Sequence, residues 1–218
     1  MGGRLIGINK GGCVIQNDTA LYKNAPIYAY GNFYMLNFTV KMTVKEMGDW
    51  HPSFEGRNSG ETYPGYAIHI DHVNMDGKQT RCIIRNCIFY SEAFPAAGVG
   101  MNENQEIVFD SCTFVRNVQE GNEYFFAPNF TGAFVAHSSN YNVNNQYLKL
   151  KDNSFISNGD YAASFLMRLE GERGAEIYAF HNFFSSKINE TECVEYDRGN
   201  SILNENSRLN TAECLNAK

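Results

Sequence analysis

The chain has 218 residues and a formal net charge of −6, with 18 lysine and arginine residues against 24 aspartate and glutamate residues. Hydrophobic residues make up 43% of the chain and apolar runs are only a few residues long, so the composition excludes a disordered tail and predicts no membrane insertion. A nucleic-acid binder needs a basic face, so the acidic balance predicts no nucleic-acid partner.

The N-terminal residues predict β-strands rather than a leader sequence. Glycine, asparagine and lysine interrupt the apolar residues of 1–10, which is not the pattern of a signal peptide. Short apolar runs at 5–8, 13–16 and 27–30 indicate strands of a repeating β-structure. Because the chain starts inside such a structure, we expect it to be part of a longer protein.

A sequence repeat begins at Cys82, Ile107, Leu148 and Ile177. Each copy has a short alternating strand, a polar corner, a phenylalanine at a constant position and a second short strand, and 33–40 is a weaker copy. The phenylalanines lie 25, 41 and 29 residues apart, so insertions interrupt a constant unit. A further strand-like run precedes each clear copy, and these runs are 66–70, 97–101, 133–137 and 164–169.

This repeat predicts an all-β fold, a single-stranded right-handed parallel β-helix of about five or six coils with inserted loops. We expect one domain over 1–218, with coils over about 5–190 and a C-terminal cap or frayed end over 191–218. No run of twelve residues has a helical apolar stripe, and a β-sandwich or propeller does not require a corner in a constant frame.

Equivalent positions of neighbouring coils stack about 4.8 Å apart, so the repeat also predicts interior columns. The apolar column is Val40, Phe89, Phe114, Phe155 and Phe184. Two residues earlier lies a corner column of Cys87, Cys112, Asn153 and Asn182, where an amide can bond both the backbone and the next amide. We expect the two cysteines to be stacked thiols without a disulfide, and His181 to be a structural corner residue.

The repeat resembles the pectin-lyase-like family of parallel β-helices, in which an Asn-x-Phe corner recurs from coil to coil. Within that family, 66–71 and 84–89 are most similar to β-helical regions of bacteriophage tail-spike and tail-appendage proteins. The resemblance covers roughly 5–190. It implies a homotrimer, located in the virion as part of a phage tail or outside the cell, whose loops bind cell-surface glycan.

Aromatic side chains beside polar ones occur in three predicted insertions. The largest, 43–64, contains Trp50, His51 and Tyr63, and the second, 119–131, contains Tyr124. A third, 138–146, is rich in asparagine and tyrosine. Ring faces stack on sugars while amides and carboxylates bind hydroxyls, so these insertions are candidates for carbohydrate binding. The alternative is that their aromatic residues cap the fold or contact a neighbouring subunit.

A second candidate site is an outward polar column near the ends of the strands that precede each copy. It contains His69, His137 and Arg168, which we add to the predicted carbohydrate-binding residues. Asp71, Glu103 and Glu170 lie in the same region and would be the catalytic acids of a glycosidase, which needs two carboxyl groups about 5–9 Å apart. A solvated face without function is the alternative for the whole column.

The sequence leaves two classes of function open. One is a phage tail-spike or tail-fibre module that binds host polysaccharide, and the other is a glycoside hydrolase or polysaccharide lyase on the same scaffold. No acid cluster gathers on one coil and the solenoid is short, which favours binding. No nucleotide loop, catalytic triad or metal-ligand spacing is present, so we expect no cofactor and no metal.

Overall fold

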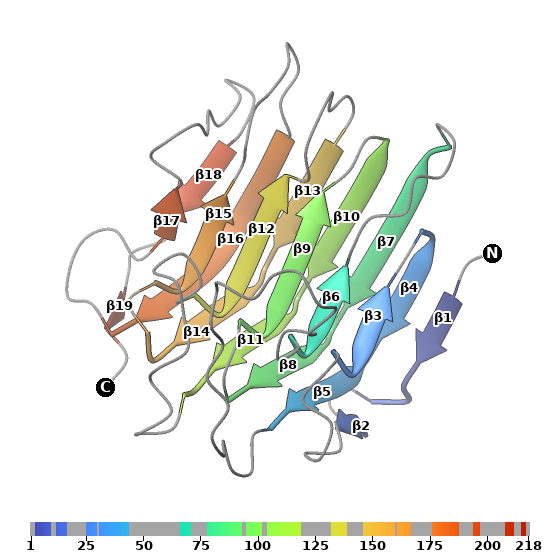
Figure 1. Ribbon diagram of the computed structural model, residues 1–218, viewed down its shortest axis with the longest axis horizontal. Coiled ribbons are helices and arrows are strands. Elements are labelled where there is room, and N and C mark those ends of the chain that lie inside the picture. The colour runs from blue at the N-terminus through green and yellow to red at the C-terminus, as the bar shows by residue number, and fades with distance from the viewer. Residues whose placement is uncertain are drawn as a thin grey trace, which may run out of the picture.

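The structure, a computed structural model, is built from short parallel β-strands (Figure 1). It describes residues 3–9, 12–16, 25–29, 31–43, 66–70, 78–92, 95–101, 104–118, 132–138, 146–159, 161–166, 176–187, 194–196, 208–211 and 215–216. Backbone alone is described for 137–138, 166, 176, 194–196, 208–211 and 215–216. Within these ranges there is no helix, and so none long and apolar enough to cross a membrane.

The strands recur in a fixed order of three, and every third strand pairs in parallel within the same group, which we name sheet A, B or C. Sheet A contains β1 (Gly3–Ile6), β4 (Phe33–Leu36), β7 (Thr80–Arg85), β10 (Gln105–Asp110), β13 (Gln146–Lys151), β16 (Glu176–Ser186) and β18 (Arg208–Thr211). Sheet B contains β2 (Cys13–Gln16), β5 (Phe38–Met42), β8 (Ile88–Ser91), β11 (Thr113–Arg116), β14 (Ser154–Ser157) and β19 (Leu215–Asn216). Sheet C contains β3 (Ile27–Ala29), β6 (Ile68–Ile70), β9 (Ala97–Met101), β12 (Phe134–Ser138), β15 (Ala163–Leu166) and β17 (Val194–Tyr196).

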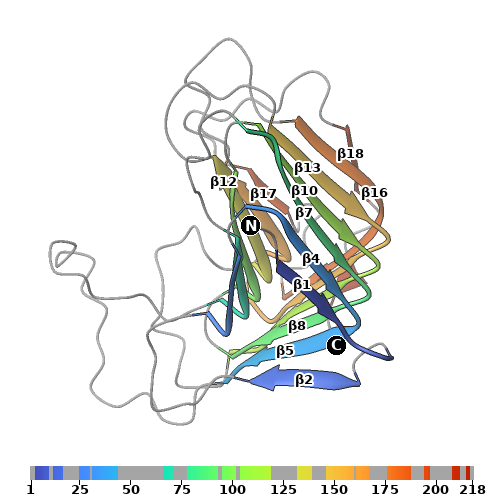
Figure 2. The same ribbon diagram turned by 90° about the vertical axis from the view of Figure 1, so that its right-hand side faces the viewer.

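Sheets A and B are two halves of one larger sheet, because β16 pairs with β13 through its first half and with β14 through its second half. Figure 2 looks nearly along the stack and shows sheets A and C facing each other, with sheet B joining them below. The predicted all-β class and parallel pairing are therefore confirmed. The arrangement is compatible with a parallel β-solenoid.

The predicted apolar column lies in register across sheet B. Val40, Phe89, Phe114, Phe155 and Phe184 are successive partners, and each is at most 1% exposed. The four phenylalanine rings stack face to face, with centroids 5.3, 5.0 and 5.0 Å apart along the column. Phe109, Phe134 and Phe165 fill the space between this column and the other two sheets, with edge or tilted contacts.

The corner between sheets A and B has one backbone conformation in five successive repeats, from the β4–β5 corner to the middle of β16. Asn37, Asn86, Ser111, Asp152 and His181 all have φ between 52° and 65°. The corner N–H of Asn86 donates to the Asp110 carbonyl, and the next corners repeat this bond along the stack. His181 is therefore a corner residue, as the repeat predicted. The left-handed region is sparsely used outside glycine, asparagine and aspartate, so serine and histidine carry a conformational cost here.

Parallel pairing continues beyond residue 190. β17 pairs with β15 of sheet C, while β18 and β19 pair with the two halves of β16. This is the segment for which the sequence suggested a cap or frayed end.

Candidate functional site

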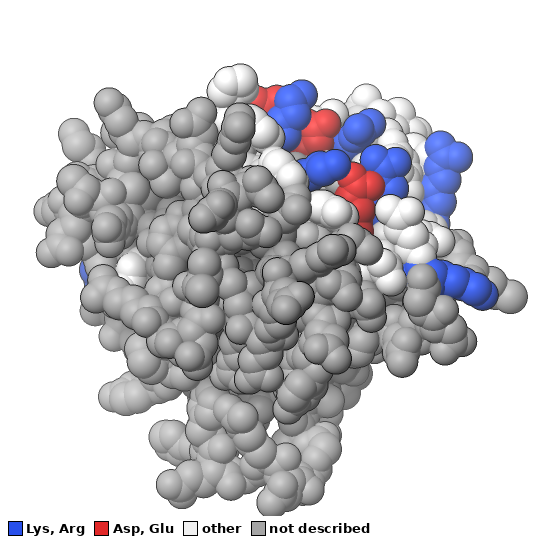
Figure 3. All heavy atoms as spheres, turned by 90° about the horizontal axis from the view of Figure 1, so that it is seen from above, with Lys and Arg blue, Asp and Glu red and all other residues white. Residues whose placement is uncertain are grey.

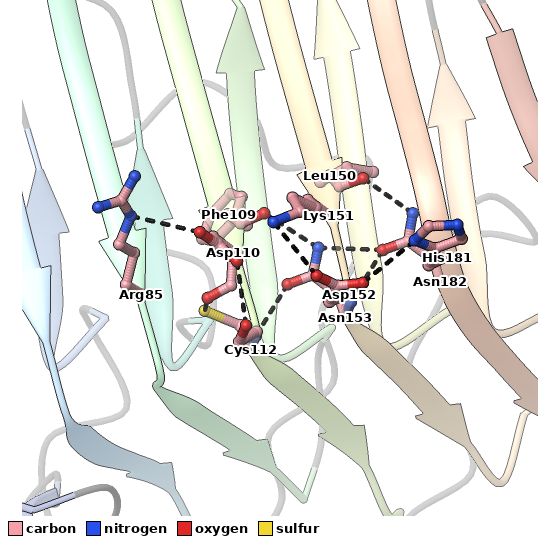
Figure 4. A network of polar contacts seen from close by, with 11 residues as sticks. Arg85, Phe109, Asp110, Cys112, Leu150, Lys151, Asp152, Asn153, His181 and Asn182 are labelled. Atoms are coloured by element: carbon pink, nitrogen blue, oxygen red, sulfur yellow. Dashed lines mark hydrogen bonds and ion pairs between the residues drawn. The ribbon is translucent and has the colours of Figure 1, made fainter.

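The corner column is a hydrogen-bond ladder that runs through the interior (Figure 4). The Asn182 Oδ1 accepts from the backbone N–H of Asn153 at 3.0 Å and from its Nδ2 at 3.1 Å. The Asn153 Oδ1 in turn accepts from the backbone N–H of Cys112 at 2.9 Å. Both side-chain amides also donate to carbonyls of sheet A, at Phe109 and Leu150. Because the column is buried and its bonds satisfy the turning backbone, its role is structural.

Cysteine fills the same column at Cys87 and Cys112, and both thiols are free and buried. The Cys112 thiol lies 3.6 Å from the Ile84 carbonyl, which is the equivalent of the carbonyls that the asparagine amides bond. Burial raises the pKa of Cys112 well above its usual value, so this thiol is protonated at neutral pH. Both cysteines therefore lie in the interior column, as the repeat predicted, and that they form no disulfide in the protein stays a prediction.

An aromatic cluster lies on the outer side of sheet C, around His69. The imidazole contacts Tyr28 edge-on, with centroids 4.7 Å apart, and Tyr66 at 4.9 Å with a tilt of 42°. Tyr28 and His69 are register partners on β3 and β6. Both occupy the middle of an apolar–polar–apolar triplet, whose outer two residues are buried in the core. Strand alternation therefore presents both rings on the outside.

Gly98 makes room for the third ring of this cluster. It is the partner of His69 on β9, and a Cβ at this position would lie 2.6 Å from the Tyr66 ring. Any side chain there would displace the ring. The close approach of Tyr66 to the sheet thus depends on glycine. We name Tyr28, Tyr66 and His69 the aromatic cluster.

Of the predicted carbohydrate-binding residues, His69 alone has a described side chain. The register pairs His69 with Gly98, whereas His137 pairs with Gly100, so these two histidines occupy different columns. The other predicted site residues lie outside the described part of the chain, namely Trp50, His51, Tyr63, Asp71, Glu103, Tyr124, Arg168 and Glu170.

Tyr28 and Tyr66 were not predicted as site residues from the sequence. A usable signal was present, because the triplets Ile27–Ala29 and Ile68–Ile70 have the same alternation and predict outward rings at their centres. The sequence did not show the register in which these two triplets pair, because a long insertion separates them.

Charged side chains gather on the outer side of sheet A, and Figure 3 shows them together on one described face. Glu106 lies between two cations, 2.6 Å from Arg81 and 2.7 Å from Lys149. The bond from Lys149, the larger cause, and the charge of Arg81 hold the pKa of Glu106 below its usual value despite partial burial. Arg85 pairs with Asp110, and Lys151 with Asp152, both at 3.4 Å.

Comparison with known proteins adds no assignment for this chain. No family model, no curated protein and no solved structure matches it. In the described ranges, no group of three or more histidine, cysteine, aspartate or glutamate side chains is placed to hold a metal ion.

Proposed function

We propose that this chain is a glycan-binding module built on a right-handed parallel β-helix, of the type found in bacteriophage tail-spikes. Three parallel sheets visited in a fixed order support the β-helix, because nearly all parallel crossovers are right-handed. The interior is filled by side chains, so a ligand has to bind on the outside of the sheets or on the insertions.

The observation that carries the proposal is the aromatic cluster. Tyr28 is 38% exposed, although it is a large ring in the first strand of sheet C. Sugars bind to proteins through stacking of their apolar face on such a ring, together with hydrogen bonds from neighbouring polar groups. The hydroxyls of Tyr28 and Tyr66 and the imidazole of His69 are polar groups of this kind, held next to the ring faces.

The predicted binding residues of the insertions adjoin this cluster along the chain. Trp50 and Tyr63 belong to the segment that ends immediately before Tyr66, and Asp71 directly follows β6. We propose that they extend the same binding surface. Several weak sites on a homotrimer, displayed on a virion or outside the cell, would bind with useful avidity even at millimolar to micromolar affinity per site.

The test is a glycan-binding assay on wild-type protein and on Tyr28→Ala and His69→Gln. We expect binding of at least one surface glycan, weakened about 3- to 10-fold by either substitution. Tyr90→Ala is the matched control, because Tyr90 lies on sheet B away from the cluster, and it should bind like wild type. Undiminished binding by both cluster variants would remove this site from the proposal.

A cleavage assay on the same glycans tests the enzyme alternative. Reducing-end and unsaturated-product measurements should show no release by wild type. Measured release would contradict a purely binding role. Loss of that release in Asp71→Asn, Glu103→Gln or Glu170→Gln would then identify the acid responsible.

A further inference from the structure

The outer side of sheet A carries more positive than negative charge, in a chain whose net charge is −6. Among the described side chains, its cations are Arg4, Arg81, Arg85, Lys149 and Lys151, and its carboxylates are Glu106, Asp110 and Asp152. We call these residues the cationic face. Five cations thus stand against three carboxylates, and the described part of the chain places no carboxylate against Arg4, whose guanidinium lies 5.4 Å from the centre of the Tyr34 ring.

The cations and the carboxylates of this face differ in how much of each side chain is exposed to solvent. The side chains of Glu106 and Asp110 are 12% and 22% exposed, while their partners Arg81 and Arg85 are 58% and 50% exposed. Lys149 and Lys151 are also more exposed than the carboxylates they meet. The carboxylates therefore lie close to the sheet, and the cations stand over them with much of their surface in water. A ligand approaching this face meets positive charge first.

The partly buried carboxylates of Glu106 and Asp110 also orient the cations. A long lysine or arginine side chain loses rotamer freedom when it binds an anion, and here much of that ordering is already fixed by the sheet. Exposed ion pairs contribute only about 0–1 kcal/mol each to the free energy of unfolding, so they add little to the stability of the fold. Ordered, exposed cations are instead well suited to bind an anionic ligand.

The arrangement fits a linear ligand rather than a single ion. The cations do not converge on one point. Arg85 and Lys151 are both in register with Asp110, so they are separated by two strand spacings, or about 9.6 Å, whereas Lys149 lies two residues out of register with Arg81 on the same two strands. One row with a cation at each end, Arg85 and Lys151, therefore runs across the strands along the direction in which the repeats stack, and Arg81 and Lys149 lie diagonally beside it. Ring faces accompany them, since Phe180 is 43% exposed at the end of the Arg85–Lys151 row.

We propose that the cationic face binds a linear polyanionic glycan, laid across the strands of sheet A with its acidic groups against Arg85 and Lys151 and against the neighbouring Arg81 and Lys149. This rests on the proposed glycan-binding function and names a second surface for it, distinct from the aromatic cluster on sheet C. Exposed rings beside ordered cations favour a sugar polymer, which offers both apolar ring faces and acidic groups.

Three polymers with one backbone test this surface, namely dextran, carboxymethyl dextran and dextran sulfate. We expect wild-type protein to bind the two charged polymers and not dextran, with affinity that falls as salt is raised. Arg85→Gln/Lys151→Gln should weaken binding about 5- to 25-fold, since each lost contact is worth up to about fivefold. Lys41→Gln/Lys187→Gln removes the same charge from positions outside the face and should change binding less than ~2-fold.

Other outcomes overturn the inference. Absence of binding to both charged polymers, or equal loss in the two double variants, would show that the face is not a polyanion site. Equal binding of a single-stranded polynucleotide through Arg85 and Lys151 would contradict the choice of a glycan. A change in oligomeric state without a change in polymer binding would make the face a subunit contact. None of these results bears on the cluster, since Tyr28→Ala and His69→Gln are tested with their own glycan.

Discussion

The interior corner column and the cationic face lie on opposite sides of the same backbone, and they obey different rules. In the column, cysteine and asparagine differ in chemistry but fit one geometry, because the thiol of Cys112 and the amide of Asn153 both donate to equivalent carbonyls of sheet A. On the face, positions in register carry arginine, aspartate and lysine in turn, at Arg85, Asp110 and Lys151. The backbone dictates what the column holds, whereas nothing in the backbone requires charge on the face. The face is thus where a ligand can set the choice of residue.

The largest expected effect is in the interior. Phe155→Ala removes a ring stacked 5.0 Å from both Phe114 and Phe184, and should lower the free energy of unfolding by about 3–5 kcal/mol. Ile156→Ala, one residue on and facing outward, should cost much less. Chemical denaturation of both variants measures the difference, and an equal or larger loss in Ile156→Ala would contradict the assigned interior.

The corner ladder should come next in size. Asn153→Ala leaves the Cys112 N–H and the Phe109 carbonyl without their partner in the interior, which we expect to cost about 2–4 kcal/mol. Asn153→Cys should recover part of this loss, because Cys112 occupies the same column. The exposed Asn158 also bonds along the stack, so Asn158→Ala is the matched control and should cost under ~1 kcal/mol. Equal losses of unfolding free energy in Asn153→Ala and Asn158→Ala would contradict this explanation.

Alkaline pH should weaken the interior through its thiols. Burial raises the pKa of Cys82 from 9.0 to about 12, so the folded state keeps a proton that the unfolded state loses. The free energy of unfolding should therefore fall as pH rises from 9 toward 12, by about 1.4 kcal/mol per pH unit from this thiol. Cys82→Ala should make that slope shallower, and denaturation at pH 7.5 and 10.5 measures it. An unchanged slope would be evidence that the thiol is not buried.

The smallest effect should be on the cationic face. Glu106→Gln removes the anion between Arg81 and Lys149 and should cost less than ~1 kcal/mol at pH 7, because both cations are exposed. Since the folded-state pKa of Glu106 is lowered, its contribution is present above about pH 4.5 and is lost as pH falls through the folded value. Denaturation over a series of pH values from 7 downward should show the difference between variant and wild type shrink as the solution becomes more acidic. A large loss of unfolding free energy at pH 7 would show instead that the charges of this face stabilise the fold.

The interior was predictable from the sequence for a physical reason. The residues around each corner have to fit one backbone geometry, so the positions of Phe155 and Asn153 have counterparts at a constant spacing in the neighbouring repeats. That spacing can be seen directly in the sequence. The outer contacts were not predictable in the same way. Tyr28, Tyr66 and His69 come together across an insertion, and the diagonal pair of Lys149 with Glu106 depends on a register that spacing alone does not fix.

The imidazole of His69 reports directly on whether the aromatic cluster binds glycan. The chain has five histidines, so their NMR signals form a small set in which His69 is assigned by its loss in His69→Gln. Titration with the glycan selected by the binding assay should shift the His69 signal along a saturable curve that gives the same affinity as binding. A His69 signal that stays in place while the glycan binds would contradict the claim.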